Sequence, residues 1–150
     1  MKILLVCTGN TCRSPLAAAI GQKIATEAGR SDVEFSSAGT QAAEDAPATD
    51  EALLVGLERG LDLGSHKSRR LTRELIADQD LVLVMSDSHL DQVRALSLGP
   101  PVEMLAGFGG SESSRRSIAD PFGGDLSVYR RTADELEVEL RQVLERIPAR

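Results

Sequence analysis

Aromatic residues are almost absent from this sequence, which has no tryptophan, one tyrosine and three phenylalanines among 150 residues. Such a chain offers few side chains for stacking a planar ring system such as a flavin, or for enclosing an aromatic substrate. No apolar run approaches the roughly 18 residues that cross a bilayer. The net charge of −6 argues against broad attraction to nucleic acid or anionic membranes. We therefore expect neither nucleic-acid nor membrane partners.

Cysteine is also scarce, because only Cys7 and Cys12 are present. Two cysteines in one short loop cannot staple a fold, and in a cytosolic protein such a pair is more often catalytic or redox-active. Together with His66 and His89 they do not match the spacing of a structural zinc site, so no metal is expected. The N-terminus runs straight into this loop, where a signal peptide would carry its cleavage site, which predicts a cytoplasmic location.

The rest of the composition is that of an ordinary globular domain. Hydrophobic residues make up 41% of the chain and charged residues 27%, and no repeat or linker divides it, so residues 1–150 are expected to form one domain. Apolar runs predict four strands, with the third in the centre of the sheet. These strands are expected at residues 3–6, 33–37, 81–85 and 102–105.

Helical patterns lie between and after these strands. Ser14 is predicted to cap the first helix, with Pro15 in its first turn. Further helices are expected at residues 50–59, at residues 87–96 and at the C-terminus. This alternation indicates an α/β fold with helices on both faces of a parallel sheet. Residues 107–117, rich in glycine, serine and arginine, are expected to form a mobile surface loop. The C-terminal helix is marked by Leu136, Leu140, Val143, Leu144 and Ile147.

Residues 7–15, CTGNTCRSP, place a cysteine and an arginine after the first strand with five residues between them. Ligands of open parallel sheets bind beyond the carboxyl ends of the strands. Successive backbone N–H groups and the following helix N-terminus form an anion site there. Gly9 allows close backbone approach, and Asn10 tolerates a left-handed conformation. The loop is therefore predicted to bind phosphate through Thr8, Gly9, Asn10, Thr11, Cys12, Arg13 and Ser14.

The same loop supplies a nucleophile. Arg13 can hold two phosphate oxygens through its planar guanidinium. These positive surroundings favour the thiolate of Cys7, which is the nucleophilic form, and the Ser14 hydroxyl is close enough in sequence to bond that sulfur. A lone cysteine at a strand end would more often be a buried apolar residue, but the neighbouring residues argue for catalysis.

The sequence resembles the low-molecular-weight protein tyrosine phosphatases over almost its whole length. Residues 7–15 resemble the phosphate loop of that family, and residues 37–39 resemble the end of its second strand. Residues 65–69 resemble its His-x-Ala-Arg segment, with Ser68 in place of the usual alanine. Residues 120–122, DPF, resemble the loop that carries the general acid. The resemblance implies a three-layer, flavodoxin-like fold with a four-stranded parallel sheet and no cofactor.

The resemblance also assigns roles to residues. Cys7 would attack phosphorus and form a phosphocysteine, with charge stabilised by Arg13 and the loop amides. Asp120 would protonate the leaving group and then activate the water that releases inorganic phosphate. Taken alone, Asp120 could be a turn residue before proline. A buried hydrogen-bond network that supports the loop would consist of Asn10, Ser37 and His66.

Thr11 bears on the choice between substrates. Tyrosine-specific members usually have an aliphatic residue there, whereas threonine resembles the bacterial protein arginine phosphatase branch. Residues 120–124, DPFGG, also resemble that branch, which makes Phe122 a second candidate for specificity. Asp120 could hold a cationic guanidinium as well as donate a proton. Phosphorylated proteins are the expected partners, with phosphoarginine favoured and phosphotyrosine as the alternative if Thr11 is a neutral replacement.

Other readings compete with the phosphatase interpretation. An arsenate reductase with a similar loop needs further cysteines, and none follows Cys12. Residues 8–11 resemble a flavin-phosphate loop, but Cys7 and Arg13 and the scarcity of aromatics argue against a flavodoxin-like electron carrier. A non-enzymatic phosphoprotein-binding module would not need both Cys7 and Asp120. Cys12 could shield Cys7 from overoxidation through a disulfide, or could simply be a packing residue.

Overall fold

The structure is a computed structural model that describes residues 1–148, and it has a four-stranded parallel sheet with the strand order β2-β1-β3-β4. The two inner strands are β1 (Lys2–Cys7) and β3 (Leu81–Val84), and the outer strands are β2 (Glu34–Gly39) and β4 (Val102–Met104). Leu83 of β3 pairs with Leu5 of β1, so the predicted third strand is one of two central strands. The buried apolar runs form the strands because both faces of the sheet are covered.

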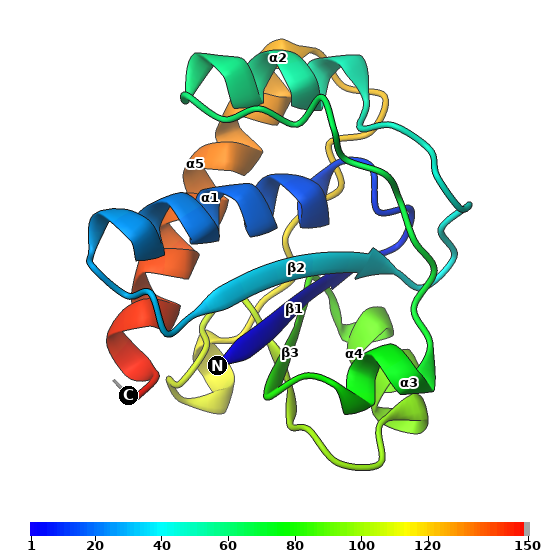
Figure 1. Cartoon of the computed structure of the whole chain (residues 1–150), viewed down its shortest axis with the longest axis vertical. Helices are drawn as coiled ribbons and strands as arrows, with labels where there is room; N and C mark the ends of the chain where they lie inside the picture. The colour runs from blue at the N-terminus through cyan, green and yellow to red at the C-terminus, as the bar shows by residue number, and fades with distance from the viewer. Residues whose placement is uncertain (149–150) are drawn as a thin grey trace.

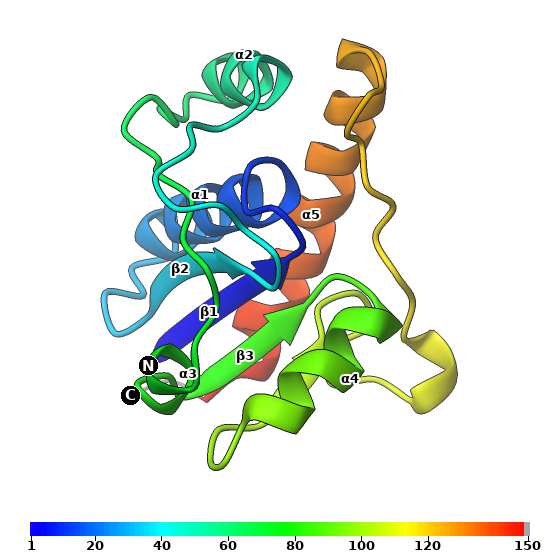
Figure 2. The same ribbon diagram turned by 90° about the vertical axis from the view of Figure 1, so that its right-hand side faces the viewer.

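Helices cover the two faces of this sheet, as Figure 1 and Figure 2 show. On one face lie α1 (Arg13–Glu27) and α5 (Leu126–Arg146), with α2 (Asp50–Glu58) packed against α5. On the other face lie α3 (Arg73–Ala77) and α4 (Asp87–Leu96). The predicted three-layer α/β fold with a four-stranded parallel sheet is therefore confirmed.

Successive side chains of β1 point to opposite faces of the sheet and pack into two separate hydrophobic cores. Ile3 and Leu5 are fully buried in the core beneath α1 and α5. Leu4 and Val6 are fully buried in the smaller core beneath α3 and α4. Because both sets are apolar, the strand stays in the centre of the molecule and its carboxyl end, Cys7, lies at one edge of the sheet.

The start of α1 differs from the prediction. The cap residue is Cys12, whose carbonyl accepts from the N–H of Leu16, and Ser14 lies inside the first turn. The prediction of Ser14 as the cap was wrong because its hydroxyl bonds Cys7 and Asn10 instead of a free backbone N–H. Pro15 lies in the first turn as expected.

Two short elements were not predicted. The five-residue helix α3 begins after Thr72, whose hydroxyl accepts from the N–H of Leu75, and it is too short to show helical periodicity. A 3-10 turn, η1 (Glu112–Ser114), lies inside residues 107–117. The N–H of Gly107 donates to buried Glu139 of α5, so the start of this loop is tethered. The mobility of the rest of the loop stays a prediction.

Candidate active site

The predicted phosphate loop lies at the carboxyl end of β1 and bounds an open cavity of about 240 Å³. Its backbone passes so close to β2 that a Cβ on Gly39 would collide with the carbonyl oxygen of Thr8, so only glycine fits there. The cavity brings together most of the predicted site residues. Its lining residues are Cys7, Thr8, Gly9, Thr11, Cys12, Arg13, Asp120 and Phe122.

The Cys7 thiol lies in this cavity and is only 3% exposed as a residue. Its sulfur is 2.9 Å from the Ser14 hydroxyl oxygen. That oxygen also accepts a hydrogen bond of 2.8 Å from the Asn10 amide, so the Ser14 proton can be donated either to the sulfur or to the carbonyl oxygen of Ala38, which lies 3.5 Å away. The N-terminus of α1 follows directly and adds its positive end to the loop. The Ser14 hydroxyl and the helix N-terminus can therefore both stabilise negative charge on the sulfur.

Asn10 holds the loop in its turn. It is fully buried and has a φ of 57°, the left-handed region that asparagine tolerates. Its side-chain amide also donates to the Ser37 hydroxyl at 3.0 Å, and its side-chain oxygen accepts from the N–H of Arg69 at 3.0 Å. Its backbone carbonyl lies 2.7 Å from His66 Nε2, which must donate because a carbonyl only accepts. The predicted Asn10, Ser37 and His66 are thus brought together.

Arg13 and Asp120 meet at the rim of the cavity. Arg13 is 6% exposed, and its Nη1 donates to the carbonyl of Ile118 at 2.9 Å. Its Nη2 lies 3.7 Å from Asp120 Oδ2. The Asp120 side chain is half-exposed, and its Oδ1 accepts from the N–H of Phe122 at 3.0 Å. The arginine therefore positions the segment that carries the carboxylate over the loop.

Thr11, Phe122 and Cys12 occupy different parts of the site. Thr11 is half-buried in the wall of the cavity, and the Phe122 side chain is largely exposed at its edge. Cys12 is buried, and its sulfur lies 3.5 Å from the hydroxyl of Tyr129. Both cysteines are free thiols, so the predicted disulfide between Cys7 and Cys12 stays a prediction.

Two residues that contact the loop, His89 and Arg69, had no role assigned from the sequence, although Arg69 lies in the segment that resembles the family. His89 Nε2 lies 2.8 Å from the Thr8 hydroxyl, and burial together with the positive charge of Arg13 lowers the pKa of His89 to about 4, against an opposing effect of Asp120. Arg69 donates from Nε to the carbonyl of Ser37 at 2.9 Å. His89 had been considered only as a zinc ligand. Its place in the first turn after the third apolar run, at the same sheet edge as the loop, was the available signal.

Tyr129 is a further missed neighbour of the loop. Its hydroxyl lies 3.3 Å from the Thr49 hydroxyl, and the N–H of Thr49 donates to the carbonyl of Thr11. Burial raises the pKa of Tyr129 to about 12, and its hydrogen bond with Cys12 acts in the same direction. The only tyrosine of the chain thus supports the loop from below instead of lining the cavity.

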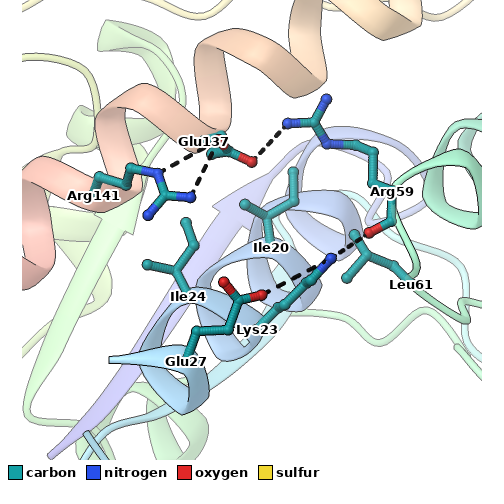
Figure 3. Close-up of a pocket in the computed structure, with 8 residues that line it drawn as sticks. All are labelled: Ile20, Lys23, Ile24, Glu27, Arg59, Leu61, Glu137 and Arg141. Atoms are coloured by element: carbon teal, nitrogen blue, oxygen red, sulfur yellow. Dashed lines mark hydrogen bonds and ion pairs between the residues drawn. The ribbon is translucent and has the colours of Figure 1, made fainter. Parts of the chain in front are cut away.

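A second cavity, of about 110 Å³, lies between α1 and α5 and contains none of the predicted site residues (Figure 3). Glu137 pairs with both Arg59 and Arg141, and Lys23 pairs with Glu27. Arg59 also pairs with Asp134 at 2.9 Å, so each of these charges already has an ion-pair partner, and we place the functional site at the loop instead. Among residues 1–148 no cluster of acidic, cysteine and histidine side chains could hold a metal ion, and none of the helices there is long and apolar enough to cross a membrane.

Comparison with known proteins identifies the family. Residues 2–150 match the low molecular weight phosphotyrosine protein phosphatases. The chain is 39% identical over 150 residues to the protein-arginine-phosphatase of Bacillus subtilis (strain 168), covering 98% of this chain and 97% of that protein. The crystal structure of a low molecular weight protein tyrosine phosphatase from T. tengcongensis superposes with a TM-score of 0.90 and 36% identity, covering 98% of this chain and 99% of that one.

A third relative is also an arginine phosphatase. It is a C7S mutant of the YwlE arginine phosphatase with a phosphorylated active-site serine, and it superposes with a TM-score of 0.84 and 36% identity, covering 97% of this chain and 94% of that one. The family resemblance inferred from the motifs is confirmed by all three relatives. Because the family model matches residues 2–150 and these relatives match the chain over almost its whole length, the chain belongs to the low molecular weight phosphotyrosine protein phosphatase family.

Proposed function

We propose that this protein is a cysteine-dependent phosphatase of phosphorylated proteins, with phosphoarginine as its favoured substrate. The observation that carries the proposal is the convergence of the Cys7 thiol, the Arg13 guanidinium and the Asp120 carboxylate on one cavity at the end of β1. A nucleophile, an anion-binding cation and a proton donor are the groups that phosphoryl transfer through a covalent intermediate requires. A module that only binds phosphoproteins would need the anion-binding cation but neither the nucleophile nor the proton donor.

The first step forms a phosphocysteine. The Cys7 thiolate attacks phosphorus, a P–S bond forms, and the bond from phosphorus to the leaving oxygen or nitrogen breaks. Arg13 and the loop N–H groups stabilise the charge on the phosphoryl oxygens. Asp120 gives its proton to the leaving group, which is essential for a guanidine because its anion leaves poorly. The phosphorylated active-site serine of the related C7S protein supports a phosphoryl-enzyme at this position.

The second step releases inorganic phosphate. The Asp120 carboxylate accepts a proton from a water that attacks phosphorus, and the P–S bond breaks to return the thiolate. Ser14 lies 2.9 Å from the sulfur and donates to it as negative charge returns. A reducing, cytoplasmic setting would keep Cys7 in the thiol state that this cycle needs.

The preference for phosphoarginine rests on Thr11 and Asp120. Thr11 presents a hydroxyl to the cavity where an aliphatic side chain would make the wall apolar. The half-exposed Asp120 carboxylate can pair with the cationic guanidinium of a substrate as well as transfer a proton. The 39% identity to a protein-arginine-phosphatase supports this choice. The exposed Phe122 ring could face either a guanidinium or a phenyl ring, so phosphotyrosine is the second candidate substrate.

Side-by-side kinetics test the proposal. We expect the wild type to have a higher kcat/KM on a phosphoarginine protein than on a phosphotyrosine peptide. Thr11→Ile should move this ratio toward phosphotyrosine by roughly tenfold or more, because the added apolar surface favours a ring over a cation. Thr26→Ile on the exposed face of α1 is the matched control and should leave the ratio unchanged.

Two outcomes would contradict the proposal at different levels. A wild type that prefers the phosphotyrosine peptide would overturn the arginine preference but keep the phosphatase chemistry. Turnover retained in Cys7→Ser would overturn the phosphocysteine mechanism itself. We expect Cys7→Ser to bind substrate and to release no phosphate, because a serine hydroxyl is a weaker nucleophile than a thiolate and a phosphoserine, once formed as in the related C7S protein, has a poor leaving group for the hydrolysis step.

A further inference from the structure

His89 lies between a helix cap and the phosphate loop and has no part in the mechanism above. It sits in the first turn of α4, is 4% exposed, and faces two hydroxyl groups with its two ring nitrogens. Nδ1 is 2.9 Å from the hydroxyl oxygen of Ser86, and Nε2 is 2.8 Å from that of Thr8. Thr8 in turn lines the cavity that holds Cys7 and Arg13. A neutral imidazole therefore connects the end of β3 to the site.

Counting donors and acceptors leaves two arrangements of hydrogen atoms. In the first, Ser86 donates its proton to Nδ1, Nε2–H donates to Thr8, and the Thr8 proton is free to point into the cavity. In the second, Nδ1–H donates to Ser86, and the Thr8 hydroxyl donates its proton to Nε2. The second arrangement would turn only lone pairs of Thr8 toward the cavity, which would repel a phosphate dianion.

The surroundings favour the first arrangement. Ser86 caps α4 and accepts from the N–H of His89, and the Ser88 hydroxyl 3.0 Å away can donate to it as well. An oxygen that already accepts has its own proton left to give to Nδ1. Burial and the nearby Arg13 charge lower the pKa of His89 to about 4, so one ring nitrogen stays an acceptor at neutral pH.

We propose that the Thr8 hydroxyl donates a hydrogen bond to the phosphoryl group, and that His89, as its Nε2–H tautomer, is the positioning residue that directs this proton. The inference rests on the phosphatase function proposed above. It adds a side-chain donor to the backbone N–H groups of the loop. Because this donor meets an anion, removing it should weaken binding of inorganic phosphate by roughly tenfold or more.

NMR of the imidazole nitrogens tests the tautomer directly. The chain has only two histidines, and the spectrum of His89→Gln assigns the signals by subtraction. His66 is an internal reference, because its Nε2 faces the carbonyl of Asn10 and must carry hydrogen. With inorganic phosphate bound, His89 should show the same Nε2–H pattern as His66. A Nδ1–H pattern would overturn the proposal.

A pair of variants tests the positioning role. The amide nitrogen of His89→Gln can take the place of Nε2 and donate to Thr8, whereas His89→Asn is one carbon shorter and reaches only Ser86. We expect His89→Gln to stay within about threefold of the wild type in the inhibition constant of inorganic phosphate and in kcat/KM. His89→Asn should lose roughly tenfold in both. Equal losses in the two variants would overturn the proposal.

The Thr8 variants complete the test. Thr8→Ser keeps the hydroxyl and should retain phosphate binding, and Thr8→Val should lose it as His89→Asn does. In the Thr8→Val background, His89→Asn should cause little further loss because it has no hydroxyl left to orient. A full additional loss would show that His89 acts by another route. If no phosphoprotein were turned over by the wild type, the proposed function would fail while the tautomer and phosphate measurements still gave their own result.

Discussion

Single side chains determine the shape of the phosphate loop, and Asn10 has the most partners among them. It contacts Ser14, Ser37, His66 and the backbone of Arg69, so that one buried residue joins the loop to β2 and to the segment after α2. A buried asparagine is stable only when its donors and acceptors are paired, and here they are. Because each partner is also oriented by this residue, the loop keeps one conformation before substrate binds.

His89 makes a testable contribution to stability at the residue scale. Its pKa falls from 6.5 to about 4 in the folded state, so the unfolded chain takes up a proton in this range before the folded chain does. The stability of the wild type is therefore fully present above about pH 6.5 and decreases as the pH falls toward 4. His89→Gln does not titrate and should lack this part of the decrease, about 3 kcal/mol in the free energy of unfolding.

Urea unfolding between pH 4 and 7 measures this difference. As the pH falls from 7 to 4, the wild type should lose more stability than the variant, because only the wild type contains His89. The carboxylates titrate in both proteins, so their contribution cancels in the comparison. Stability curves that stay parallel across this range would show that His89 keeps an ordinary pKa in the folded protein.

At the scale of elements, α5 holds the connection that carries Asp120. Glu139 of α5 is 4% exposed, lies 2.8 Å from Nη2 of Arg116, and accepts from the N–H of Gly107. Both of these partners belong to the connection between β4 and α5, residues 105–125, which also contains Ile118 and Asp120. The buried carboxylate thus ties the two sides of a glycine-rich loop to a rigid helix.

Replacing this carboxylate by an amide tests the tether. Glu139→Gln removes the charge that holds Arg116 and should destabilise the protein by about 1–3 kcal/mol, since its partner charge is left partly buried. Cleavage by trypsin after Arg115 and Arg116 should become faster. Glu135→Gln is the matched control, because Glu135 pairs with the same arginine at 3.1 Å but is more exposed, and it should cost less than about 1 kcal/mol. Equal effects of the two variants would contradict a special role for Glu139.

The whole molecule assembles its site from segments that are far apart in the sequence. Figure 2 shows β1 and β3 ending at the same edge of one parallel sheet. At this edge the loop after β1 contacts His89, which follows β3, and Asp120, which precedes α5. The chain has a net charge of −6, yet this edge presents N–H groups and the buried Arg13. Local donors therefore determine which ions bind there, because a charge at contact distance outweighs screened charges elsewhere on the surface.

Inorganic phosphate should therefore stabilise the fold as a whole. At a concentration of 100 times its dissociation constant, a ligand that binds only the folded state adds about 2.7 kcal/mol. For a domain of this size that corresponds to a rise in Tm of roughly 5–10 °C. Chloride at matched ionic strength and the Arg13→Lys variant are the controls, and neither should show this rise. An equal rise in Arg13→Lys would place the phosphate elsewhere on the protein.

Much of the fold and the reacting groups could be predicted from local sequence patterns. The continuous apolar runs of β1 and β3 and the helical periodicity of α5 are visible in the sequence. Together they predicted an α/β fold with a parallel sheet. The spacing of Cys7 and Arg13 identified a phosphate loop because a backbone turn of that length encloses one anion. What failed was local detail: Ser14 was assigned to a cap, but its hydroxyl bonds Cys7 and Asn10, and only the folded loop decides which of these nearby partners the hydroxyl takes.

The sequence by itself thus determined the sheet and the family and predicted the nucleophile, because the patterns behind them lie among residues that are close together in the chain. Only the tertiary structure decided which distant groups serve the loop. It showed His89 bonded to Thr8 and Tyr129 placed beneath Cys12, although 81 and 117 positions separate these pairs. The physical reason is that a hydrogen bond depends on distance in space, and a parallel sheet brings the ends of all its strands to one edge whatever their separation in sequence.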